Sequence, residues 1–132
     1  MQPSINFHLN QKSGVPAYQQ IIQQVKHGLR LNFLDIGDQL PTVREVTSSI
    51  VINPNTVLKA YRQLENEGLV ETRQGQGTFI VATLGNTDLD FTFFQSQLKE
   101  WICHVLQNGY TREDVEAVFY YSLQEAMSEV SA

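Results

Sequence analysis

Carboxylate side chains are the residues of this sequence with the most evident catalytic potential. Glu65 and Glu67 form one pair, and residues 113–116 hold three more acids. Residues two apart on a helix point in different directions, and exposed acids on helices are usually solvated. The histidines and Cys103 have no metal-ligand spacing, and no nucleophile–base pair or phosphate loop is visible. The sequence therefore predicts no enzyme, no metal site and no cofactor.

A second set of polar residues is suited to binding double-stranded DNA. Asparagine presents a donor and an acceptor together, which matches the edge of adenine, and threonine can bond to bases or phosphates. An arginine on an outer helix face can reach a base or the backbone. These candidates are Arg44, Asn53, Asn55, Thr56 and Lys59. Each also has a simpler interpretation, since Asn53 is first a helix cap and a lone arginine is usually solvated.

Two short helices must position these side chains. Residues 42–45, Thr-Val-Arg-Glu, form a capping box that starts the first of them. Residues 50–52 are the expected turn, after which Asn53 and Pro54 start a second helix that ends at Gly68. The N-terminal residues of such a second helix lie at the base edges in the major groove.

A preceding helix and a following β-hairpin complete the expected domain. The first helix opens at Pro16, carries one apolar stripe and fades within residues 28–34. Strands at 69–73 and 78–81 flank a glycine-rich turn, whose backbone can enter the minor groove. This order of elements predicts an α+β fold with a winged helix-turn-helix DNA-binding domain, three helices plus a hairpin wing, over residues 1–82.

Residues 83–132 predict a two-helix dimerisation domain. One helix is expected at about 88–107, and Thr111 caps the other. Eight of the 13 aromatic residues lie here, more than two helices can bury against each other. A homodimer is the simplest solution, because palindromic half-sites require a two-fold protein. The expected dimer interface comprises Phe91, Phe94, Leu98, Trp101, Val105 and Phe119.

Three other interpretations remain open at this point. A monomer could fold its tail back on its own winged domain, or the aromatic residues could form a ligand cage. The winged domain could also bind a protein instead of DNA, because fold alone does not decide function. The compact polar side chains on the second short helix favour DNA.

The net charge of −5 is unevenly distributed along the chain. Residues 1–82 hold seven Lys/Arg and six Asp/Glu, a net +1, whereas residues 83–132 hold two and eight, a net −6. DNA binding must therefore depend on where the positive charges lie. The sequence has no apolar run near the roughly 18 residues of a membrane span and no signal-peptide pattern. We expect a soluble, cytoplasmic protein with no membrane partner.

Six blocks of the sequence resemble the signature of the GntR family of bacterial transcriptional regulators. They are PAYQQI at 16–21, GDQLPTVRE at 37–45, NPNTV at 53–57, AYRQLE at 60–65, EGLV at 67–70 and GQGTF at 75–79. The NPNT run and the short helical tail resemble the YtrA-type subfamily. The resemblance implies a repressor that binds a palindromic operator as a homodimer. It implies DNA contacts at Thr42, Arg44, Asn53, Asn55, Thr56, Lys59, Gln74 and Gly75.

Three features depart from the family pattern. Pro54 stands where many members have an arginine, which removes one expected phosphate or base contact. Residues 47–49, Thr-Ser-Ser, replace a more apolar helix end. The large ligand-binding domains of the family are not expected, since about 50 residues follow Val81, and the sequence indicates no particular small-molecule effector.

Overall fold

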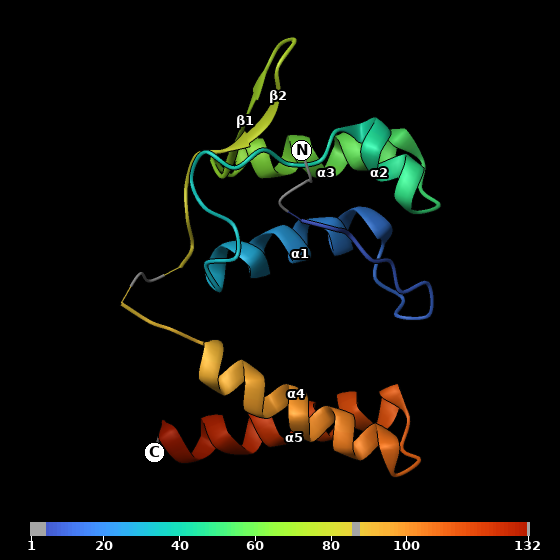
Figure 1. The fold of residues 1–132 in the computed structure, drawn as a ribbon, viewed down its shortest axis with the longest axis vertical. Helices are drawn as coiled ribbons and strands as arrows, with labels where there is room; N and C mark the ends of the chain where they lie inside the picture. Colours follow the sequence, from blue (N-terminus) through green and yellow to red (C-terminus); the bar gives the residue numbers. More distant parts are fainter. Residues whose placement is uncertain (1–4, 86–87, 132) are drawn as a thin grey trace. The chain divides into compact units, whose positions relative to one another are not determined.

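The computed structural model describes residues 5–85 and 88–131, and contacts divide the chain into two units (Figure 1). The first unit, Met1–Leu89, contains α1 (Ala17–Arg30), α2 (Val43–Ser49), α3 (Pro54–Asn66), β1 (Val70–Arg73) and β2 (Gly77–Ile80). The second, Asp90–Ala132, contains α4 (Thr92–Gln107) and α5 (Arg112–Val130). This element order confirms the predicted α+β fold, a winged helix-turn-helix followed by two helices.

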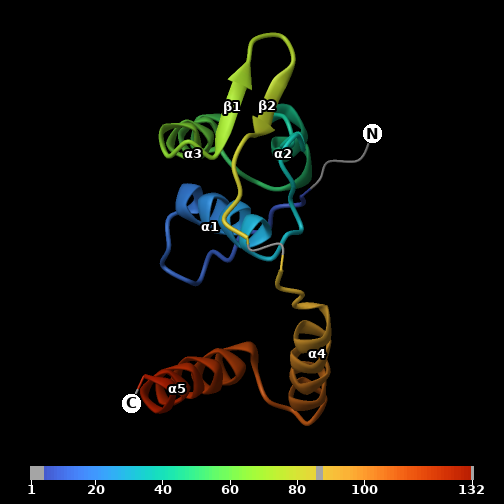
Figure 2. The ribbon, with the colours of Figure 1, turned by 90° about the vertical axis from the view of Figure 1, so that its left-hand side faces the viewer.

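Helices α1, α2 and α3 pack around one hydrophobic core. The stripe on α1 and the inner face of α3 supply most of it, because their apolar residues recur every three or four positions. Val70 and Ile80 pair at the base of the hairpin and are buried, whereas its tip at Gln74 and Gly75 is exposed. The hairpin consequently projects away from the three helices (Figure 2). Core members from the helices are Ile21, Ile22, Val25, Leu29, Val46, Val57, Ala60, Tyr61 and Leu64.

Local sequence explains where the two short helices begin. The amide of Glu45 donates to Thr42 Oγ1 (3.1 Å), and the amide of Thr42 donates to Glu45 Oε1 (3.0 Å), which confirms the capping box. The Thr42 amide also holds the pKa of the Glu45 carboxyl below its usual range. Asn53 Oδ1 accepts from the amide of Asn55 (2.8 Å), which confirms the second cap. After α3, Gly68 adopts a φ of 79° and turns the chain directly into β1.

An extended N-terminal arm is bound to α1 by two glutamine side chains. Gln20 Oε1 accepts from the amide of Asn10 (2.8 Å), and Gln20 Nε2 donates to the Asn10 carbonyl (3.0 Å). Gln24 bonds to His8 in the same way: its Oε1 accepts from the His8 amide (3.0 Å), and its Nε2 donates to the His8 carbonyl (2.6 Å). Each side-chain amide thus replaces the neighbouring strand that an extended segment would otherwise pair with. The arm places Phe7 in the core, where it is 6% exposed.

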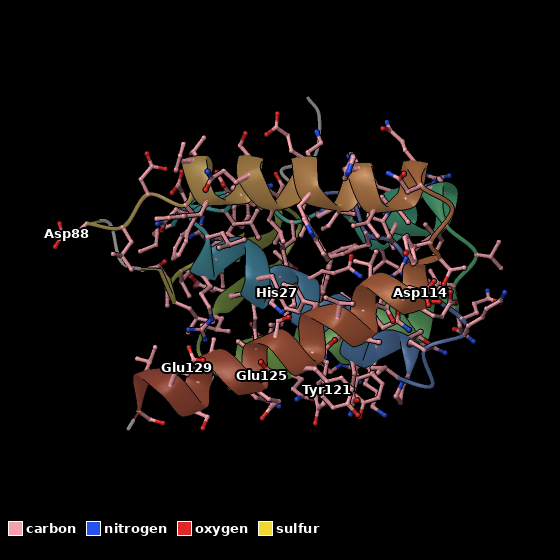
Figure 3. All side chains as sticks on the ribbon, turned by 90° about the horizontal axis from the view of Figure 1, so that it is seen from below. His27, Asp88, Asp114, Tyr121, Glu125 and Glu129 are labelled. Carbon is pink, nitrogen blue, oxygen red and sulfur yellow. The ribbon has the colours of Figure 1, made fainter. Side chains whose placement is uncertain are left out.

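The second unit consists of α4 and α5, and Figure 2 shows these helices diverging from the turn that joins them. Helix α4 begins at Thr92, later than the expected position near 88, because Asp90 Oδ1 accepts from the Thr92 amide (2.9 Å) and fixes the start there. Thr111 caps α5 as predicted. Acidic side chains are spread along α5, with Asp114, Glu125 and Glu129 visible in Figure 3. Neither helix contains a buried residue.

Candidate nucleic-acid interface

The start of α2, the outer side of α3 and the hairpin enclose a groove of about 580 Å³, which we call the wing groove. Three of the predicted contact residues, Thr42, Gln74 and Gly75, line it together. All three are exposed. The remaining lining residues are Pro41, Val43, Leu58, Tyr61, Arg62, Glu65, Thr72, Arg73, Gln76, Gly77 and Thr78.

Hydrogen bonds from two sides fix the hairpin relative to α3. Glu65 Oε2, on α3, accepts from the amide of Thr72 at 2.8 Å. On the other side, Gln39 Nε2 donates to the Gln76 carbonyl (3.1 Å), and the Leu40 amide donates to the Thr78 carbonyl (2.8 Å). These bonds fix the hairpin relative to α3, so that both elements border the same groove.

The exposed face of α3 carries polar residues at its N-terminal end. Asn55 is exposed on the first turn and Thr56 is half-buried beside it. The side-chain oxygen of Asn53 is occupied by the helix cap, which leaves its amide group to donate outward. This polar face lies opposite the core-facing residues of the helix, so it is accessible to an external ligand.

Five of the eight predicted contact residues do not line the wing groove: Arg44, Asn53, Asn55, Thr56 and Lys59. The Lys59 ammonium lies 3.9 Å from the centroid of the Tyr18 ring on α1, a cation–π contact. Arg44 is exposed and lines a separate open pocket of about 620 Å³ beside residues 5–7 of the arm. Both side chains are exposed on the surface.

The sequence interpretation missed Arg62, Arg73 and Leu58, which all line the wing groove. Arg62 is exposed and follows Asn55 by seven residues, about two helical turns, so helical spacing could have placed it on the same exposed face. Arg73 could not have been placed in this way. Its guanidinium lies 4.5 Å from the Phe79 ring centroid and 3.6 Å from Glu71 Oε2, contacts that depend on the hairpin register.

The predicted dimer-interface residues lie on the apolar sides of α4 and α5. Leu98, Trp101 and Phe119 line an open pocket of about 370 Å³ together with Val118, Ser122 and Leu123. Phe94 is 67% exposed, Phe119 48%, Leu98 40% and Trp101 39%, and Phe91 and Val105 are half-buried. A pair of helices with this much exposed apolar surface lacks a core of its own.

Tyr61 connects α3 to the segment that precedes α2. Its hydroxyl donates to the Pro41 carbonyl (2.6 Å), and both residues are buried. Burial raises the pKa of Tyr61, so the hydroxyl keeps the proton that it donates. This bond supports one wall of the wing groove.

We expect Tyr61→Phe to lower the free energy of unfolding by about 1–3 kcal/mol, because the buried carbonyl loses its donor. Urea denaturation followed by circular dichroism measures the change. Tyr18→Phe is the matched control, since among the described residues the Tyr18 hydroxyl accepts only an exposed bond from Gln19 Nε2 (3.2 Å). This variant should stay within about 0.5 kcal/mol of the parent. Equal stabilities for the two variants would contradict the role given to Tyr61.

The amino-acid sequence is similar to those of known bacterial regulatory proteins. The model of bacterial regulatory proteins of the gntR family matches residues 17–80. The HTH-type transcriptional repressor YtrA of Bacillus subtilis is 38% identical over 126 residues, which cover 94% of this chain and 91% of YtrA. No helix in the described part of the chain is long and apolar enough to cross a bilayer.

Solved structures of similar fold cover most of the chain. The structure of a transcriptional antiterminator from Listeria monocytogenes EGD-e aligns with a TM-score of 0.58 and 32% identity, over 92% of each chain. The structure of YtrA from Sulfolobus acidocaldarius, a GntR-family transcription factor, aligns with a TM-score of 0.53 and 27% identity, over 76% of this chain and 97% of that one.

Proposed function

Because the chain belongs to the GntR family of bacterial regulatory proteins, we propose that it represses transcription by binding a palindromic operator as a homodimer. Family membership makes it a DNA-binding transcription regulator and not an enzyme. We propose further that residues 1–82 bind DNA, that residues 83–132 form the dimer, and that the protein acts in the cytoplasm.

The observation that carries this proposal is the exposed polar face of α3 beside the hairpin. A helix of this kind fits the major groove, with its N-terminal residues at the base edges, and a glycine-containing tip fits the adjacent minor groove. Arg62 joins the sequence-derived set as a phosphate contact, because it lies toward the far end of α3 from the base-contacting residues. The proposed contacts are Thr42, Arg44, Asn53, Asn55, Thr56, Lys59, Arg62, Gln74 and Gly75.

The homodimer is supported by the second unit. Its helices expose large apolar residues, six of which we assign to the interface: Phe91, Phe94, Leu98, Trp101, Val105 and Phe119. Apolar area of this kind is covered in stable proteins, and a second copy of the same surface covers it symmetrically. A two-fold protein then presents two α3 helices to two half-sites.

A gel-shift assay of the full chain against the DNA upstream of its own gene tests the proposal. We expect a complex that survives an excess of random-sequence competitor, because specific sites are typically bound about 10³–10⁷ times more tightly than non-specific DNA. Scanning overlapping fragments then locates the site. If random-sequence competitor removes the complex as easily as unlabelled upstream DNA does, the result would contradict operator recognition.

We expect the operator affinity to depend modestly on salt, with a log–log slope of about −3 to −6 for the dimer. The cationic members of the proposed contact set are Arg44, Lys59 and Arg62, so that the two protomers together present six cations to the DNA. Titrations by fluorescence anisotropy at several salt concentrations give the slope. Arg62→Ala should make it less negative by about 2 per dimer, one phosphate contact in each protomer.

Lys26→Ala is the matched control for the salt titration, because the Lys26 ammonium is already paired with Glu67 at 2.7 Å and lies outside the groove. Its slope should equal that of the parent. A parent slope near zero would indicate that the winged domain binds a protein partner instead of DNA.

A further inference from the structure

Leu58 is an exposed apolar side chain on an otherwise polar surface of α3. It is 38% exposed, although the core-facing side of the helix is already filled by Val57, Ala60, Tyr61 and Leu64. The part of the side chain that remains accessible is available to contact a ligand.

The position of Leu58 places it within the proposed DNA-contacting surface. It lies three residues after Asn55 and four before Arg62, and residues with these spacings share one face of a helix. It also lines the wing groove together with Thr42 and Arg62. A ligand that contacts Asn55 and Arg62 must therefore pass over Leu58.

The chemistry of the duplex identifies the partner of this side chain. The C5 methyl of thymine is the apolar group that a base pair presents in the major groove, and aliphatic side chains contact it. Polar donors on the flanking turns, Asn55 and Arg62, match the neighbouring base edges and phosphates. We propose that Leu58 packs on the methyl group of a thymine and thereby specifies thymine at one position of each half-site. This inference rests on the proposed function.

The test begins with in vitro selection of the preferred duplex by the full chain. Each thymine of the selected half-site is then replaced, in both half-sites together, by deoxyuridine, which lacks the methyl group but keeps the same hydrogen-bonding edge. We expect one position at which uracil lowers the affinity by about fourfold per half-site, the effect of leaving one methyl group uncovered. At that position the Leu58→Ala variant should bind the thymine and uracil duplexes equally well.

Two variants control for general loss of binding. Leu58→Met keeps an apolar side chain and should retain the thymine preference. Ile36→Ala truncates an apolar side chain that is 62% exposed and does not line the groove, and it should leave both affinities unchanged. Circular dichroism verifies that each variant is folded.

The outcomes separate this inference from the function on which it rests. Selection that enriches no sequence would overturn the proposed function and this inference with it. An enriched site without a methyl-sensitive thymine would overturn the inference alone. The same holds if Leu58→Ala keeps the full uracil penalty, because another side chain would then contact the methyl group.

Discussion

The fragment 1–89 should be a folded monomer that binds the operator about 10²–10⁴ times more weakly than the full chain. The first unit keeps its complete core, so it should fold without α4 and α5. The affinity falls because a dimer binds its second half-site from a high effective concentration, whereas the fragment must bind each half-site independently. Non-specific binding should fall less.

The structure sets the cutting point at Leu89 because the segment before it packs on the first unit. Leu84 contacts the core, and Thr83 Oγ1 lies 3.5 Å from the Leu29 carbonyl oxygen. A fragment ending at residue 83 would lose the contact between Leu84 and the core. Sedimentation of 1–89 beside the full chain gives the oligomeric state, and titrations against a palindrome and a single half-site give the affinities. A dimeric fragment would show that the interface lies outside α4 and α5.

A point variant tests the interface without deleting it. Leu98→Asp places a charge in the α4–α5 pocket and should dissociate the dimer, because an unpaired charge is costly to bury. Ser96→Asp adds the same charge to a different side of α4 and should leave the dimer intact. A full chain that sediments as a monomer at micromolar concentration would contradict the dimer altogether.

Arg44→Ala should weaken operator binding by about 1–3 kcal/mol at each half-site, so that the two losses combine in the dimer. The Arg44 side chain is exposed and forms no ion pair among the described residues, so its removal should not affect the fold. Binding to the operator and to random-sequence DNA should be measured in parallel. A base contact lowers specific binding more than non-specific binding, whereas a phosphate contact lowers both equally.

Arg30→Ala is the control for this variant, because it removes the same charge from the exposed end of α1. Its operator affinity should stay close to that of the parent. If Arg44→Ala binds the operator as tightly as the parent does, Arg44 does not contact the DNA.

The features that were predictable from the sequence are those set by neighbouring residues. The capping box at Thr42, the helix cap at Thr111 and the Asn53-Pro54 helix start depend on side chains within three positions of the residues they cap. The predicted strands at 69–73 and 78–81 lie within one residue of β1 and β2. The start of α4 was missed because the Asp90 side chain, and not the apolar pattern, determines it.

The arrangement of the candidate site depends on contacts between distant residues and was not predictable in the same way. The wing groove exists because Glu65 bonds to Thr72 and Gln39 to Gln76. The position of the Lys59 ammonium over Tyr18 likewise depends on how α3 packs on α1. Helical spacing could have identified Leu58 and Arg62 as exposed, but their place in the groove required the hairpin.

The hydrogen bonds from Gln20 and Gln24 on α1 to the N-terminal arm have a consequence for the genetics of this regulator. Gln20 Nε2 donates to the carbonyl oxygens of Asn10 and Val15, so a carboxylate there would face two carbonyl acceptors in a position that is only 9% exposed. One nucleotide change converts either glutamine codon into a glutamate codon. Screens for derepressed mutants should therefore recover Gln20→Glu alleles, whose defect is a misfolded protein at low abundance, although the residue belongs to neither the DNA surface nor the dimer interface.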